Sequence, residues 1–272
     1  MHSSISVTAI VNAHREGLLV KPTLGSVIQA VAHAREHNIT TEVIIVLDRA
    51  DSMTRTIVHD HCDAENWRAI EVDHGDLGLS RNDGAKASKG DLVAFLDGDD
   101  LWGDNWLTAC AKAHVHRPEP IVWHPEVSIY FGRNAYCYRH IDMESEEFNL
   151  IDLSVSNPWT ALACARRDVF LRAPYPQTDL TRGIGYEDWG WNLRSIEQGV
   201  IHKVVPGTGH AIRVKRQAES LLGHTNAVGA VPHPTMLFRK ALLRSIPYRG
   251  CRDRQDLKIM RRGKAALLGE GG

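Results

Sequence analysis

One stretch, Asp91 to Asp100 (DLVAFLDGDD), constrains the fold more than any other part of the chain. The residues Leu92 to Leu96 carry no polar side chain, which is typical of a strand buried on both faces, as in a parallel sheet. Asp97, Asp99 and Asp100 follow directly, and their carboxylates repel one another unless a cation or solvent screens them. Open α/β sheets bind ligands at the carboxyl ends of their strands. A divalent cation with a phosphate-bearing ligand is therefore the first hypothesis, and a solvated acidic turn is the alternative.

The chain before this strand alternates between strand patterns and helix patterns. Strands are expected at Ile5–Val11, Glu42–Leu47 and Trp67–Val72, and helices at Leu18–His37, Ser52–His61 and Ser80–Lys89. Such alternation predicts right-handed βαβ units and a parallel sheet, so the fold class is α/β.

After Asp100 the pattern is mixed. Helices are expected at Trp106–His114, from Arg166 and at Glu187–Gln198, and short strands at Ile121–Trp123, Val127–Phe131, Trp159–Cys164, His202–Val205 and Ala211–Val214.

Composition excludes several classes of protein. The formal net charge of −1 over 272 residues provides no global field that would select nucleic acid. The five cysteines form no CxxC pair, so a reducing cytoplasm is expected, and the N-terminus does not resemble a signal peptide. Residues 239–264 hold ten Lys or Arg and only two acidic residues. This basic tail is interpreted as a solvated helix or, alternatively, as an arm that contacts an anionic membrane surface or a partner.

Polar residues at the ends of the expected strands and helices could carry chemistry. Asp48 could accept hydrogen bonds from a base or ribose, and the planar guanidinium of Arg81 could pair with a diphosphate. Asp99 could ligate a metal that neutralises a leaving diphosphate. Asp188, at a helix N-terminus, could act as a general base. Taken singly, each of these signals is weak, because an Asp after a strand is often a turn former or a helix cap.

Two blocks together make the chain resemble the inverting, nucleotide-sugar-dependent glycosyltransferases of family two, which have the GT-A fold. The stronger block is Leu79 to Trp102, LSRNDGAKASKGDLVAFLDGDDLW, which resembles the family's Arg-Asn run, its apolar strand and its DxD motif. The second is Gly185 to Trp191, GYEDWGW, which resembles the ED motif on the acceptor side. The match extends from about Ser6 to about Leu222, and Val46 to Thr54 resembles the family's second strand and turn.

The resemblance implies a role for each matching residue. Asp188 would be the catalytic base and Glu187 would position the acceptor. Asp99 would ligate Mn²⁺ or Mg²⁺. The remaining substrate-binding residues would be His14, Glu16 and Asp97 near the base or ribose, Asp48 on the nucleobase, and Arg81 on the diphosphate.

The first motif departs from the family, because Asn12 to Glu16 reads NAHRE and leaves any stacking role to His14. Uridine, guanosine and thymidine donors all stay open. A further metal or phosphate ligand after the ED helix is also open among His210, His224, Arg213 and Arg216.

These observations predict one GT-A type domain, Rossmann-like, with helices on both faces of a mostly parallel sheet. Residues 1–230 would form it, with a nucleotide-sugar half at 1–100 and an acceptor half at 101–230, followed by a basic C-terminal extension at 231–272. The expected function is metal-assisted, inverting transfer of a sugar to a glycan or a lipid-linked saccharide, in the cytoplasm or peripherally at the inner face of the membrane. The alternatives are a nucleotidyltransferase that makes the activated sugar, and a non-catalytic nucleotide-sugar-binding protein.

Overall fold

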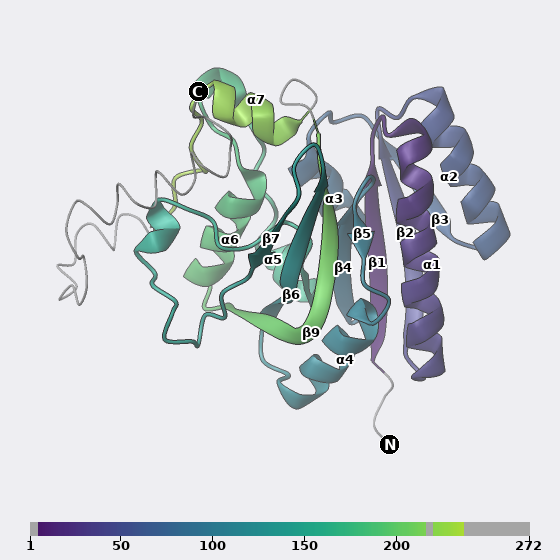
Figure 1. Ribbon diagram of the computed structural model, residues 1–272, viewed down its shortest axis with the longest axis horizontal. Coiled ribbons are helices and arrows are strands. Elements are labelled where there is room, and N and C mark those ends of the chain that lie inside the picture. The colour runs from purple at the N-terminus through teal and green to yellow at the C-terminus, as the bar shows by residue number, and fades with distance from the viewer. Residues whose placement is uncertain (1–4, 216–219, 237–272) are drawn as a thin grey trace. The chain divides into compact units, whose positions relative to one another are not determined.

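The computed structural model describes residues 5–215 and 220–236 (Figure 1). Its strands are β1 (Ser6–Ala13), β2 (Thr40–Asp48), β3 (Arg68–Val72), β4 (Leu92–Asp97), β5 (Leu101–Trp102), β6 (Ile121–Gly132), β7 (Tyr136–Arg139), β8 (Cys164–Arg166) and β9 (Ile201–Val214). Its α-helices are α1 (Val20–Glu36), α2 (Ser52–Glu65), α3 (Leu77–Ala87), α4 (Trp106–His116), α5 (Arg167–Arg172), α6 (Glu187–Glu197) and α7 (Leu221–Ala227). Short 3₁₀ turns lie at Gly17–Leu19, Asp152–Ser154 and Leu180–Arg182.

The described strands form one mixed sheet in the order β3-β2-β1-β4-β8-β6-β9-β5, with β7 paired to β6. β3, β2, β1 and β4 are parallel, so their carboxyl ends meet at one edge. β8 lies antiparallel between β4 and β6, and β6 pairs in parallel with β9. The α/β fold with a mostly parallel sheet that the sequence predicts is thus confirmed.

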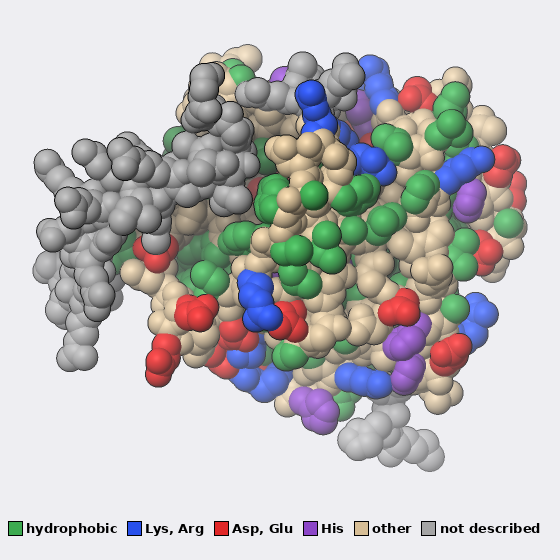
Figure 2. All heavy atoms as spheres, viewed as in Figure 1, with side chains coloured by type: hydrophobic (Ala, Val, Ile, Leu, Met, Phe, Trp, Pro, Cys, Tyr) green, Lys and Arg blue, Asp and Glu red, His purple; other side chains and the backbone are tan. Residues whose placement is uncertain are grey.

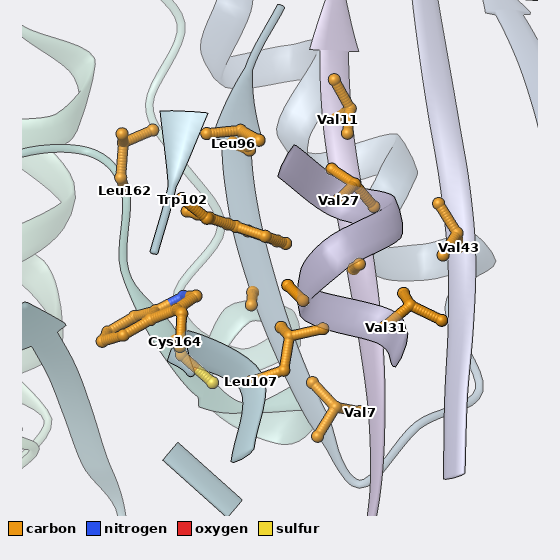
Figure 3. Packing of buried hydrophobic residues seen from close by; sticks show 14 of the residues in the cluster. Val7, Val11, Val27, Val31, Val43, Leu96, Trp102, Leu107, Leu162 and Cys164 are labelled. Atoms are coloured by element: carbon orange, nitrogen blue, oxygen red, sulfur yellow. The ribbon is translucent and has the colours of Figure 1, made fainter. Parts of the chain in front are cut away.

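Helices cover both faces of the sheet because the central strands are apolar on both sides. One core lies between the strands and helices α1, α2 and α4, and Figure 3 shows Val27 and Val31 of α1 packed against the strands that carry Val11 and Val43. The other core lies under α3, α5 and α6 and includes Phe170. Full burial of such side chains contributes about 1.5–3 kcal/mol each, so the two cores fix the positions of the strand ends.

Several elements differ from the sequence prediction. β6 runs without a break through Pro125, where two strands were expected, because a register shift between Pro125 and Val127 accommodates the missing N–H. β9 is likewise one strand instead of two. α3 begins at Leu77 rather than at Ser80, because the side chain of Asp76 caps it by accepting from the backbone N–H of Leu79.

The expected strand at Trp159–Cys164 is displaced to β8. At Trp159 the backbone N–H donates to the side chain of Asn157 rather than to a neighbouring strand. β5, β7 and α7 are not predicted from the sequence, because their residues show no clear strand or helix pattern.

The described residues up to Thr235 form one compact unit. The basic tail, with its expected membrane contact, lies outside the described residues. Among the described helices, none is long and apolar enough to cross a membrane. On the face drawn in Figure 2, hydrophobic side chains gather over the region that β6, β9 and β5 occupy in Figure 1, and charged side chains and histidines lie along its lower rim.

Candidate active site at the carboxyl end of the sheet

The acidic motif lies where the sequence predicts it, at the carboxyl end of β4. Asn12 of β1 pairs with Asp97, so the loop after β1 and the loop after β4 are neighbours. Gly98 favours this approach, because a Cβ there would be tightly placed, 3.0 Å from the backbone oxygen of Asn12 and 3.1 Å from the carboxyl carbon of Glu16. The sheet therefore brings Asp97, Asp99 and Glu16 to one edge.

A fully buried guanidinium joins this edge to the ED motif. Nη2 of Arg81 donates to Oδ1 of Asp97 and Nη1 donates to Oε1 of Glu187, each at 2.8 Å. The Arg81 side chain is 0% exposed, and its guanidinium carbon lies 5.3 Å from the ring centroid of Tyr175. Burial alone would lower the pKa of Arg81, but the two carboxylates hold it above its ordinary value. Arg81 thus faces these carboxylates rather than an open surface that a diphosphate could reach.

The ED motif begins α6 behind a residue with unusual backbone geometry. Tyr186 has φ of 54°, in the left-handed region, which costs a residue with a side chain about 1–3 kcal/mol. Its hydroxyl donates to Oδ1 of Asn226 at 2.5 Å, so the turn is anchored on α7. The turn directs the consecutive carboxylates of Glu187 and Asp188 to different neighbours, Arg81 and Asn157.

Asp188 has the electrostatic properties of a base that works near neutral pH. Burial, followed by the neighbouring charge of Glu187, raises the pKa of Asp188 to about 7, although Arg81 opposes the shift. General bases are most effective when their pKa lies near the working pH. The arrangement can therefore accept a proton from a hydroxyl that approaches Asp188.

Asn157 is a site residue that the sequence analysis missed. Its Nδ2 donates to Oδ2 of Asp188 at 3.1 Å, and its Oδ1 accepts from Nδ2 of Asn192 at 3.0 Å. Asn157 is 31 residues from Asp188 in a segment without regular structure, and no sequence motif marks it.

Asp99 lies 5% exposed beside two cationic side chains from the end of β9. Nζ of Lys215 is 3.0 Å from Oδ1 of Asp99, and Nε of Arg213 is 3.9 Å from Oδ2. Burial raises the pKa of Asp99, while Lys215 opposes this. Oδ2 of Asp99 is buried without a hydrogen-bond donor, so one acceptor is left for a further cation.

Among residues 5–215 and 220–236, no group of three or more His, Cys, Asp or Glu is arranged to hold a metal. A divalent ion at Asp99 would therefore need ligands from the substrate, which is how Mg²⁺ is commonly held together with phosphates. The third carboxylate, Asp100, accepts from the backbone N–H of Arg213 at 2.7 Å and ties the loop to β9.

Asp48 lies at the carboxyl end of β2, as expected, but its carboxylate is already hydrogen-bonded within the protein. The carboxylate accepts from the backbone N–H groups of His74, Gly75 and Asp76 and from the hydroxyl of Ser80, at 2.8–3.1 Å. Burial would raise the pKa of Asp48, and these donors lower it overall. A contact between Asp48 and a nucleobase would have to displace one of these hydrogen bonds.

His14 and Glu16 occupy the loop after β1. The backbone N–H of His14 donates to Oε2 of Glu16 at 2.6 Å, and the exposed His14 ring contacts the backbone oxygen of Asp48. Burial raises the pKa of Glu16. The carboxyl group of Glu16 lies next to the turn at Gly98, between Asp97 and Asp99.

The two histidines considered as further ligands lie in other surroundings. His210, on β9, is 1% exposed, and its ring packs edge-on against Trp106 with centroids 4.6 Å apart. His224 lies on α7. Arg216 falls outside the described residues.

Comparison with known proteins identifies a family. A family model described as "Glycosyl transferase family 2" matches residues 8–172. No curated protein sequence matched the chain.

Among solved structures, the fold is similar to S. aureus TarS. The crystal structure of TarS 1-349 in complex with UDP-GlcNAc aligns with a TM-score of 0.59 and 16% identity, over 78% of this chain and 59% of that one. The complex of the same fragment with UDP gives 0.59 and 16%, over 82% and 65%. A longer TarS structure gives 0.58 and 17%, over 77% and 37%. The chain therefore spans less than two thirds of these proteins, and at this identity the likeness concerns the fold.

Proposed function

Since the chain belongs to glycosyl transferase family 2 and is therefore a glycosyltransferase, we propose that it transfers a sugar with inversion from a nucleotide diphosphate sugar to a hydroxyl group of a glycan or lipid-linked saccharide. The observation that carries the proposal is the Arg81 bridge. It links Asp97, at the end of β4, to Glu187, at the start of α6. The bridge therefore connects the carboxyl edge of the sheet, where the sugar donor is expected to bind and which we call the donor edge, to the helix that carries the expected base, Asp188.

Asp188 removes the proton from the acceptor hydroxyl. The oxygen forms a bond to the anomeric carbon, the bond from that carbon to the diphosphate oxygen breaks, and the nucleotide diphosphate leaves with the electron pair. Attack opposite the leaving group inverts the anomeric configuration. A pKa of about 7 supports this role, because Asp188 is then both ionised and basic enough near neutral pH.

Asp99 is the proposed ligand for Mn²⁺ or Mg²⁺, and its undonated Oδ2 supports this assignment. The ion, when bound, would neutralise charge on the diphosphate. Lys215 and Arg213 lie on the same carboxylate, so they are placed to balance its charge and to meet phosphate oxygens.

Some of the remaining residues are proposed to contact the substrates, and others to hold the site in shape. His14, Glu16 and Asp97 are proposed to contact the nucleoside, because Glu16 and Asp97 lie at the Gly98 turn and the backbone N–H of His14 donates to Glu16. Glu187 positions the acceptor. The burial of Arg81 favours a positioning role for this residue over contact with the diphosphate, and the hydrogen bonds of Asp48 favour shaping of the 74–76 loop.

The test begins with a thermal-shift screen of UDP-, GDP- and TDP-sugars with Mn²⁺, because a ligand that binds the folded state raises its melting temperature. Transfer is then measured with the donor that binds, and the anomeric configuration of the product is read by NMR. Asp188→Asn should abolish transfer and keep donor binding, whereas Asp63→Asn, an exposed change on α2, should leave both transfer and donor binding unchanged. Near-normal transfer by Asp188→Asn would disprove the base assignment. A retained anomeric configuration would disprove inversion.

The two rival functions predict other results. A nucleotidyltransferase would release pyrophosphate from a nucleoside triphosphate and a sugar phosphate. A non-catalytic binding protein would bind the donor and never turn it over. Location in the cytoplasm, with the basic tail on the inner membrane surface, is proposed from composition alone.

A further inference from the structure

The hairpin of β6 and β7 places three tyrosines on one face. Tyr130 pairs with Tyr136, and Ser128 pairs with Tyr138. Because side chains alternate along a strand, Tyr130, Tyr136 and Tyr138 point to the same side, while Ile129 and Cys137 point to the other. The rings of Tyr130 and Tyr136 are stacked, with centroids 4.4 Å apart and planes 9° from parallel.

One end of this tyrosine face adjoins the donor edge of the site. Tyr130 pairs with Ile212 of β9, and the next residue, Arg213, donates its backbone N–H to Asp100 at 2.7 Å. The side chain of Arg213 reaches toward Asp99.

The other end adjoins the proposed base. The Tyr138 ring meets the ring of His140 edge-on at 5.4 Å. The next residue, Ile141, accepts at its backbone oxygen from Nε1 of Trp159 at 2.7 Å, and the backbone of Trp159 donates to Asn157, which holds Asp188. Burial raises the pKa of Tyr130, and the neighbouring Tyr136 and Tyr138, followed by the charges of Asp100 and Asp188, add to the shift.

The three rings are partly exposed, and within residues 5–215 and 220–236 none of their hydroxyls hydrogen-bonds to another residue. A cross-strand aromatic pair commonly serves only to stabilise its hairpin. Here the rings also present apolar surface, and hydroxyl groups without a hydrogen-bond partner among the described residues, between the donor edge and the proposed base. That combination suits a sugar, whose ring carries both C–H groups and hydroxyls.

We propose that Tyr130, Tyr136 and Tyr138 form an acceptor platform on which a pyranose ring of a saccharide acceptor stacks, with its reactive hydroxyl directed toward Asp188. The proposal rests on the proposed function and deepens it, because it names the residues that hold the saccharide acceptor and the way they contact its sugar ring.

The platform is tested by steady-state kinetics with the identified donor and a panel of oligosaccharides and methyl pyranosides as acceptors. Tyr136→Ala should raise the KM for the acceptor about tenfold and leave the KM for the donor unchanged. Tyr136→Phe, which keeps the ring, should stay near wild type. Tyr136→Leu keeps apolar volume for folding but has no aromatic face, and should behave like Tyr136→Ala.

Ile129→Ala is the matched control, because Ile129 is 48% exposed on the opposite face of the same hairpin. Thermal unfolding of each variant checks that the hairpin is intact. If a folded Tyr136→Leu variant has the acceptor KM of Ile129→Ala, the platform is disproved. If wild type glycosylates a peptide or an alkyl alcohol and no saccharide, the platform and the saccharide acceptor of the proposed function are both disproved, while transfer from a nucleotide sugar stands. If no donor sugar is transferred at all, the proposed function fails, and saturation-transfer NMR with the same pyranosides then shows whether the tyrosine face binds a sugar, which decides the platform independently.

Discussion

Replacement of Arg81 by Met tests the bridge that joins the two motifs. Methionine has similar length and can fill the buried space, but it removes a charge that Asp97 and Glu187 share at 2.8 Å each. Loss of one member of a buried ion pair costs about 3–5 kcal/mol, because the remaining charge stays buried without a partner. Here Glu187 is 8% exposed and Asp97 is 26% exposed, so most of the cost falls on Glu187. Since domains are stable by about 5–15 kcal/mol, Arg81→Met should lose a large part of the free energy of unfolding.

The assay is urea unfolding at about pH 8 and about pH 5.5, followed by circular dichroism. Without Arg81, the carboxylate of Glu187 would be buried without a cationic partner. Burial of an unpaired carboxylate costs more free energy in the charged form than in the protonated form, and lower pH favours the protonated form. The deficit of Arg81→Met relative to wild type should therefore be larger at the higher pH. Arg55→Met is the control, because it breaks a bidentate pair with Glu71 that is 40–49% exposed, and it should unfold close to wild type at both values.

One result would refute this reasoning. If Arg81→Met unfolds like wild type but no longer binds a nucleoside diphosphate in calorimetry, Arg81 contacts the diphosphate as the sequence comparison implies, and the bridge does not stabilise the fold. Arg81→Lys gives a second check, since a single ammonium group cannot bind both carboxylates as the planar guanidinium does. It should fall between wild type and Arg81→Met.

Three further predictions concern the other carboxylates. The log of kcat/KM for transfer should fall with unit slope as the pH drops below the Asp188 pKa of about 7, because the base becomes protonated; a flat profile down to about pH 5 would contradict the assignment. Asp99→Asn should weaken binding of the nucleoside diphosphate in Mn²⁺ and leave binding without metal almost unchanged, as measured by calorimetry; equal Mn²⁺ dependence in variant and wild type would count against a metal at Asp99. Asp48→Asn should lose about 1–3 kcal/mol in urea unfolding, because an amide cannot accept at both ends, whereas Asp73→Asn, at an 88% exposed side chain, should lose almost nothing; equal stability of the two variants would exclude the loop-shaping role.

The parallel half of the fold could be predicted because its strands β1, β2 and β4 contain runs buried on both faces and the strands alternate with amphipathic helices. Such strands admit few other arrangements, and the apolar run Leu92 to Leu96 is fully buried as expected. The second half was less predictable because its pairing is non-local. β8 pairs with both β4 and β6 through only a few residues, and the sequence of Cys164–Arg166 alone does not indicate that this strand pairs on both sides.

The candidate site shows the same division. The motifs pointed to Asp99 and Asp188 because the roles proposed for them, metal binding and proton acceptance, call for carboxylates. Asn157 and Lys215 escaped detection because their contacts with Asp188 and Asp99 join residues that are far apart in the sequence. The residue that a side chain contacts depends on the assembled fold, and a short sequence motif does not specify such long-range contacts.

The Arg81 bridge has one more consequence, because it couples parts of the site that the motifs treat as separate. If the variant suffers mainly from the uncompensated charge of Glu187, then Arg81→Met combined with Glu187→Gln should recover much of the lost stability, since removal of both partners of a buried pair is far less costly than removal of one. The two changes should then be strongly non-additive in a double-mutant cycle. Transfer activity should not return with stability. The double variant regains stability but still lacks the contact that holds α6, and with it Asp188, next to the donor edge. Activity that recovered in parallel with stability would mean that Arg81 and Glu187 serve the fold alone.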